Sequence, residues 1–179
     1  MQNTSIDKTD FLMALFQRMI VILRSEHDFA LKLLKEVTIG KKIVFLLDDE
    51  KMVITATRKN GYTLIGKKAE TEELPNFIST AATLRAIVEG TISLDHALVV
   101  QAIYLKAPME EMLGIYRLVI CLLTNGIIDN SLRGLWRDFD LNWPKQPGRE
   151  RLSALINQLP IHGPFIKEIP EQVLLTSAL

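Results

Sequence analysis

The stretch from Thr83 to Ala107 constrains the fold more than any other part of the sequence. It contains two short apolar helical patterns separated by Gly90, and then a run of residues typical of a β-strand. Apolar side chains recur in both predicted helices and in the strand, and the stretch has no combination of residues suited to catalysis. It therefore predicts a domain built around an apolar core or cavity, and not around a reacting centre.

Composition and charge limit the class of protein. The chain has 179 residues, which is enough for one sizeable core, and its 21 Lys and Arg residues balance its 21 Asp and Glu residues. Without a positive excess, the chain has no electrostatic basis for binding nucleic acid, whose affinity depends on neutralising phosphates. A net charge of zero also gives little protection against self-association, so the sequence is compatible with a homodimer.

The sequence predicts a soluble, cytoplasmic protein. Its N-terminus lacks the basic region and apolar run of a signal peptide, and no apolar run approaches the ~18–20 residues of a membrane span. We expect at most a transient contact with a membrane surface, because Lys41–Lys42 and Lys67–Lys68 are explained as solvated strand ends. The single cysteine, Cys121, fits a reducing compartment, and its apolar neighbours predict that it is buried.

The residues before Gly40 predict helical structure. Apolar residues from Phe11 to Leu23 follow helical spacing, and a second apolar pattern runs from Phe29 to Val37. Between them, Ser25–Asp28 has the pattern of a capping box. The sequence is therefore compatible with two helices, or with one helix that bends near Ser25.

A change of period after Gly40 indicates a β-sheet. Acidic residues at Asp48–Glu50 predict a turn, and Asn60–Gly61 between two β-like runs is a strong hairpin signal. A proline places the fourth run near a sheet edge or a strand start. The predicted strands are Ile43–Leu47, Met52–Thr57, Tyr62–Ile65, Leu74–Ser79 and Ile103–Lys106.

Further helices are predicted after the fourth and fifth strands, where Ser79 or Thr80, Ser93 and Pro108 are suitable starting residues. Trp136, Phe139 and Trp143 are expected to be buried against the main domain, or to form a lid or a dimer contact. We expect one domain at residues 1–126 and an extension packed on it at 127–179. The predicted helices are Ala81–Glu89, Leu94 to about Val100, Pro108 to Asn125–Gly126, and two short ones around Leu132–Phe139 and Leu152–Leu159.

The order of these elements resembles the sterol-carrier-protein type 2 family over roughly Leu12–Leu123. The family's signature positions are matched by Leu84, Ile87, Gly90, Ile92 and Ala97–Leu98, and the strand that follows by Leu105–Ala107. The resemblance implies an α+β fold of the sterol-carrier type, with a five-stranded, mostly antiparallel sheet covered by helices and a C-terminal extension. The family often has glycine where this chain has Gln101 and Ala107, so the turns around the last strand are expected to be absent or remodelled.

The resemblance implies non-enzymatic binding or transfer of an apolar ligand, such as a fatty acyl chain, a sterol or another lipid, in a cavity between sheet and helices. Each methylene removed from water contributes roughly 0.8 kcal/mol, so a long chain needs no charged anchor. The same side chains would also fill an ordinary packed core, and the alternative is a ligand-free interaction or dimerisation module. The residues predicted to line the cavity are Phe45, Phe77, Leu84, Ile87, Leu98, Ile103, Met112, Leu113 and Tyr116.

No catalytic, metal or cofactor site is predicted. The histidines His27, His96 and His162 lack the helical spacing to a second histidine that metal sites use. Turn chemistry explains the acidic residues at Asp48–Glu50. Phosphate-binding glycine loops and the nucleophile elbow of hydrolases do not occur in the sequence. We therefore expect a protein that is not an enzyme.

Overall fold

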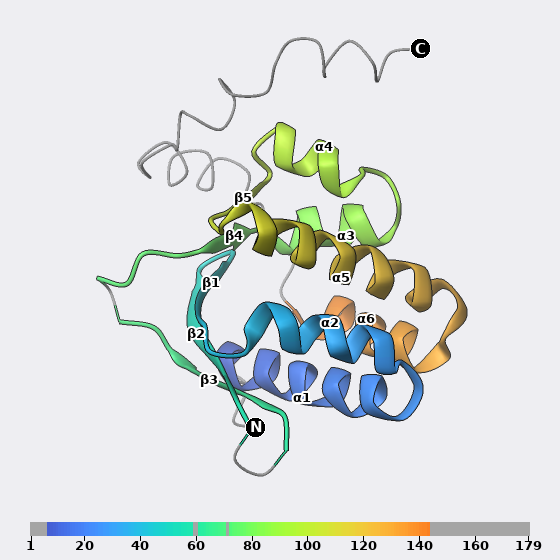
Figure 1. Cartoon of the computed structure of the whole chain (residues 1–179). Coiled ribbons are helices and arrows are strands. Elements are labelled where there is room, and N and C mark those ends of the chain that lie inside the picture. The colour runs from blue at the N-terminus through green and yellow to red at the C-terminus, as the bar shows by residue number, and fades with distance from the viewer. Residues whose placement is uncertain (1–6, 59–60, 71, 144–179) are drawn as a thin grey trace, which may run out of the picture.

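A five-stranded sheet with helices packed on one of its faces forms the protein (Figure 1). The structure is a computed structural model that describes residues 7–58, 61–70 and 72–143. The predicted helix around Leu152–Leu159, His162, and Asn60 of the predicted hairpin turn lie outside the described residues. The elements are α1 Lys8–Glu26, α2 Asp28–Thr38, β1 Lys42–Leu47, β2 Glu50–Thr57, β3 Thr63–Lys68, β4 Phe77–Ser79, α3 Ala81–Val88, α4 Leu94–Val99, β5 Ile103–Leu105, α5 Met109–Ile128 and α6 Asn130–Asn142.

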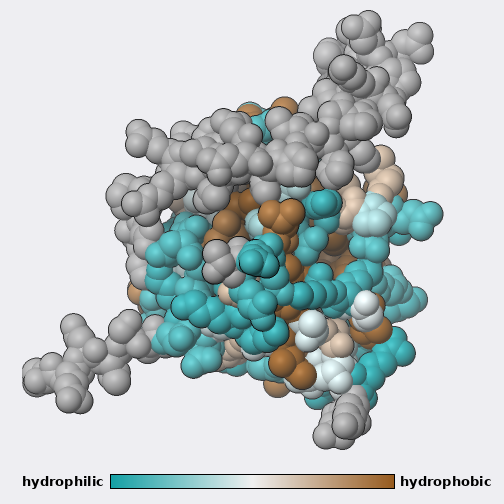
Figure 2. Space-filling view, turned by 90° about the vertical axis from the view of Figure 1, so that its left-hand side faces the viewer, coloured by the Kyte–Doolittle hydropathy of each residue, from teal (hydrophilic) through white to brown (hydrophobic). Residues whose placement is uncertain are grey.

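The sheet is mixed, with the strand order β3-β2-β1-β4-β5. The β1–β2, β2–β3 and β4–β5 pairs are antiparallel, whereas β1 and β4 are parallel, with Phe45 opposite Phe77. The parallel pair arises because the connection after β3 returns the chain to the end of the sheet where β1 begins. Seen from the sheet side, hydrophilic side chains cover much of the surface, with hydrophobic patches between them (Figure 2).

The N-terminal region forms two helices that meet at His27, as one of the two alternatives predicted. His27 has φ −139° and ψ 62°, which breaks the helical path. The predicted capping box is wrong, because Ser25 lies in the last turn of α1 and its hydroxyl donates to the carbonyls of Val21 and Ile22. The side chain of His27 makes no capping hydrogen bond to α2.

The main core lies between the inner face of the sheet and helices α1, α2 and α6. Leu23 of α1 and Met52 of β2 are completely buried, and Trp143 at the end of α6 is 2% exposed. The indole of Trp143 donates to Asp48 Oδ2 at 2.6 Å, so the β1–β2 turn holds the end of α6. Burial of Phe139 and Trp143 against the main domain is thereby confirmed, and Trp136 is half-buried beside them.

The α5 helix does not end at Asn125–Gly126 as predicted. It continues to Ile128, and Asp129 then adopts an extended conformation and caps α6 by accepting from the Ser131 amide at 2.6 Å. Gly126 does not adopt the positive φ angle with which a glycine commonly ends a helix, so α5 continues through it. The boundary expected between residues 126 and 127 therefore falls inside α5.

The turn before β5 keeps a tight form although it lacks the expected glycine. Gln101 adopts φ 56°, a left-handed conformation that usually favours glycine. The amides of Gln101 and Ala102 donate to the carbonyls of Leu98 and Ala97 at 3.1 and 2.8 Å, which closes the end of α4. A tight turn therefore forms at this position with a glutamine in the left-handed conformation.

Candidate functional site

Two aromatic residues predicted to line a cavity meet in the middle of the sheet. The rings of Phe45 in β1 and Phe77 in β4 stack with centroids 4.6 Å apart and an interplanar angle of 3°. Phe16 of α1 approaches the ring of Phe45 edge-on at 6.2 Å, so this pair faces the helices. Both rings are only half-buried although they sit on adjacent central strands. The inner face of the sheet is therefore less tightly closed here than around Met52.

A small apolar cluster brings together more of the predicted residues. Ile87 of α3 and Ile103 of β5 are buried in it, and Leu98 of α4 packs against them together with Phe77. Leu84 packs against the main core instead. The predicted residues on the sheet, α3 and α4 thus lie in one region but divide between two clusters.

The predicted residues on α5 do not join that region as a group. Met112 is half-buried, whereas Leu113 and Tyr116 are 54% and 37% exposed. The Tyr116 hydroxyl donates to Asp95 Oδ2 of α4 at 3.4 Å. The spacing of Leu113 and Tyr116 was compatible with a core-facing position, but these two side chains lie on the outer side of the helix.

The α5 helix is rich in apolar residues, although few of its side chains are fully buried. Leu118 is its only buried residue, and 6% of its most apolar 18-residue stretch is buried. Helices that are apolar on all sides are normally found inside a core or a membrane. By length and composition, α5 is also the one helix in the described part of the chain that could cross a membrane.

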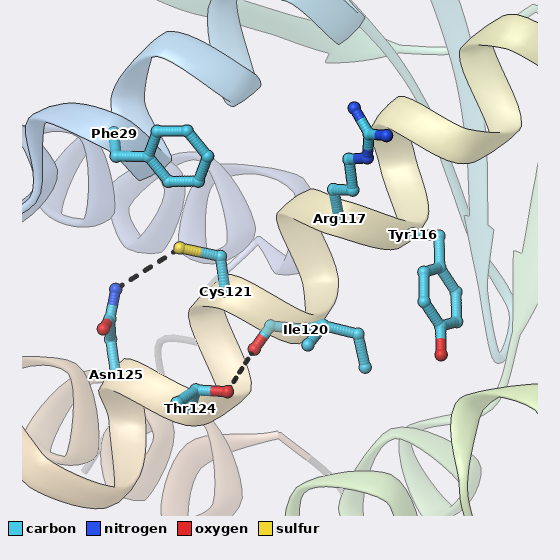
Figure 3. A pocket seen from close by; sticks show the side chains of 7 residues that line it. All are labelled: Phe29, Tyr116, Arg117, Ile120, Cys121, Thr124 and Asn125. Carbon is cyan, nitrogen blue, oxygen red and sulfur yellow. Dashed lines mark hydrogen bonds between the residues drawn. The ribbon is translucent and has the colours of Figure 1, made fainter.

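A groove with a volume of about 370 Å³ runs between α2 and α5 (Figure 3). The two helices approach closely at Gly114, where a Cβ atom would lie 3.0 Å from Val37 Cγ1. Toward the other end of α2 the groove opens, and Phe29 projects into it with 65% of its surface exposed. The lining residues are Phe29, Tyr116, Arg117, Ile120, Cys121, Thr124 and Asn125.

The polar side chains of the groove offer donors and one positive charge. Thr124 donates its hydroxyl to the Ile120 carbonyl at 2.8 Å, and the Asn125 amide donates to Cys121 Sγ at 3.5 Å. Arg117 is the charged residue of the lining. Cys121 packs against the main core and also lines the groove, so it is half-buried and not fully buried as predicted. Sequence reasoning also missed the groove, because Phe29 fits the apolar pattern of α2.

A second polar cluster joins the α1–α2 junction to the α5–α6 junction. His27 Nε2 lies 2.5 Å from Asp129 Oδ2, and this hydrogen bond lowers the pKa of Asp129 from 3.8 to about 2. Potential ligand atoms of Glu26, His27 and Asp129 lie within 4.8 Å of one another, a set that could hold a metal ion. Because Asp129 already caps α6 and binds His27, the cluster is explained as a link between helices. Glu26 and His27 are adjacent in sequence, but Asp129 lies 102 residues after His27, so no local spacing signal identifies the cluster.

No protein-family model, curated protein or solved structure matches this chain. Function therefore has to be inferred from the groove, the α5 surface and the half-buried aromatic pair of this molecule. A fold alone does not define an activity, whereas the chemistry of a site limits what it can bind.

Proposed function

We propose that this protein binds an apolar ligand without catalysing a reaction, in line with the resemblance of its sequence to the sterol-carrier type. The observation that supports this proposal best is the state of α5: Leu118 is its only fully buried residue, and the apolar side chains of Leu113, Tyr116, Ile120 and Ile127 are exposed. A ligand lying against this helix would remove apolar area from water, at about 25 cal/mol for each Å². The half-buried pair of Phe45 and Phe77 adds a second region of accessible apolar surface.

The groove between α2 and α5 is the proposed binding place. Its volume of about 370 Å³ lies in the range of small-molecule sites, roughly 300–1,000 Å³. Phe29 lies on the α2 side of the groove and Ile120 and Cys121 on the α5 side, so an aliphatic chain would contact an aromatic ring on one side and carbon and sulfur atoms on the other. Among the residues predicted from the sequence, Tyr116 belongs to this lining.

The proposal is tested by placing a charge in the groove. We expect Ile120→Glu to lower the affinity for decanol and decanoate about ten-fold or more, because a carboxylate beside an aliphatic chain loses hydration. Ile65→Glu is the matched control, since Ile65 is 53% exposed on β3 and Ile120 is 40% exposed. Affinities measured by isothermal titration calorimetry would contradict the proposal if wild-type protein binds neither compound, or if both variants lose binding equally.

The alternative function, an interaction or dimerisation module without a ligand, is favoured by the same exposed residues. Leu113, Tyr116, Ile120 and Ile127 recur at helical spacing along one side of α5. Such a stripe could pack against a second protein surface. Sedimentation equilibrium distinguishes the two functions: a dimer that Ile120→Glu dissociates, in protein that binds no decanol, supports the module.

A further inference from the structure

We infer that the α2–α5 groove selects ligands whose apolar chain ends in an anionic group, a carboxylate or a phosphate, held by Arg117. This inference rests on the proposed function and specifies the ligand class. A neutral lipid and a charged amphiphile would both suit the apolar walls. The polar atoms of the lining separate these two classes of ligand.

The charge of the groove is the first argument. Arg117 brings a guanidinium group, and the lining contains no Asp or Glu side chain. Other arginines of α1 and α3 are already engaged: Arg18 pairs with Asp138 and Arg85 with Asp140. Within the described residues, Arg117 forms no such ion pair. It therefore remains available to an anion from outside the chain.

The hydrogen-bonding capacity of the lining is the second argument. Guanidinium groups donate only, in a fork that matches the two oxygens of a carboxylate or a phosphate. The Asn125 amide adds a donor whose partner within the protein is the weak acceptor Cys121 Sγ, at 3.5 Å. The Thr124 hydroxyl already donates to the Ile120 carbonyl, which leaves its oxygen free to accept. The Arg117 guanidinium and the Asn125 amide are thus donors that an anionic group satisfies and a cationic group does not, whereas Thr124 offers an acceptor only.

The arrangement of these groups agrees with an amphiphilic ligand. Arg117 and Tyr116 project from one part of α5, while Cys121 and Asn125 lie one and two turns further along the same helix (Figure 3). Phe29 lies across the groove from Cys121. A ligand can therefore place its head at Arg117 and its chain along Ile120 and Cys121, beneath Phe29.

The experiment compares four ligands that share a ten-carbon chain: decanoate, decyl phosphate, decanol and decyltrimethylammonium. Binding of each to the full chain is measured by calorimetry below the concentration at which the ligand forms micelles. We expect at least one of the two anions to bind about three- to ten-fold more tightly than decanol, and the cation to bind more weakly than decanol. The tighter anion identifies the head group, and the preference decreases with added salt.

Variants assign the preference to its residue. Arg117→Gln should remove the preference for the anions and leave decanol binding unchanged, whereas Arg117→Lys should keep part of it. Arg137→Gln, at an exposed position on α6 outside the groove, is the matched control for net charge. Unfolding midpoints of all variants verify that each one is folded.

The outcomes separate the inference from the function on which it rests. Equal affinity for the anions and decanol, or a preference that Arg117→Gln leaves intact, overturns the inference while apolar binding stands. Failure of the wild-type protein to bind any of the four compounds overturns the proposed function. Equal loss of anion binding in Arg137→Gln and Arg117→Gln shows a general charge effect and also overturns the inference.

Discussion

The two sides of this molecule use apolar residues in different ways. On the side of α1, α2 and α6, which we call the closed side, Leu23 and Met52 are fully buried and Trp143 is held by Asp48. On the side of α3, α4 and α5, the open side, the α5 helix is more apolar than α1, α2 or α6, yet Leu118 is its only buried residue. The difference indicates that the closed side supplies most of the buried core, and that the open side leaves apolar side chains such as Leu113 and Ile127 exposed.

Truncation of a leucine on each side should give the largest contrast. Leu23→Ala removes a fully buried side chain from the closed side, and we expect it to lower the free energy of unfolding by about 2–5 kcal/mol. Leu113→Ala on the open side should change it by less than about 0.5 kcal/mol, because Leu113 is 54% exposed. Urea unfolding measures both values, and similar losses would remove the distinction between the sides.

Adding a methyl group to a glycine on each side tests the same distinction. At Gly66 of β3, a Cβ atom would lie 2.1 Å from Met13 Sδ and 2.9 Å from Met52 Cε. Gly66→Ala should therefore destabilise the protein by about 1–3 kcal/mol, with the flexible methionines limiting the loss.

Gly126→Ala in α5 is the counterpart, because a Cβ atom there meets no atom within 4 Å. We expect this variant to be stabilised by about 0.5–1 kcal/mol, since alanine favours the helix over glycine. Thermal unfolding of the two variants gives shifts of opposite sign under this interpretation, and a destabilised Gly126→Ala protein would show that the open side is packed more tightly than described.

The smallest expected effect concerns the hydrogen bond between His27 and Asp129, which joins the α1–α2 junction to the α5–α6 junction. Because the pKa of Asp129 is lowered from 3.8 to about 2, its ionised form stabilises the fold above about pH 4, and this contribution is lost as the pH falls toward 2. Asp129→Asn keeps a capping residue but removes the charge that faces His27.

We therefore expect stability in Asp129→Asn to be lower by about 0.5–1 kcal/mol at pH 5, and to approach that of the wild type near pH 2. Asp28→Asn, at an exposed position in the first turn of α2, is the control. Chemical unfolding between pH 2 and pH 6 provides the measurement, and a constant difference across this range would contradict the role of the ion pair.

Local patterns in the sequence predicted the elements well, because they depend on neighbouring residues. Five strands form near the predicted runs, although the fourth is limited to Phe77–Ser79 and does not begin at Leu74. The helix caps at Thr80 and Ser93 and the stop at Gly90 are observed, with φ 74° at the glycine. The five-stranded α+β architecture agrees with the prediction. The parallel pairing of β1 with β4 could not be predicted, since a two-residue period does not identify the neighbouring strand.

The candidate site was less predictable because it depends on which side of a helix faces the core. The apolar residues of α5 surround the helix, so their spacing does not separate an inner from an outer face. Leu113 and Tyr116 were consequently placed in a cavity, and Phe29 was read only as part of the apolar pattern of α2. The bond between His27 and Asp129 joins residues 102 positions apart and has no local signal.

The left-handed backbone at Gln101 has a consequence for how relatives of this chain should be sought. A non-glycine residue in that conformation is under steric strain, so glycine is the residue that a sequence pattern would require there. Here the hydrogen bonds at the end of α4 hold the conformation with glutamine instead. A left-handed turn at this position therefore does not require a glycine. Distant homology is then better traced through torsion angles than through glycine spacing.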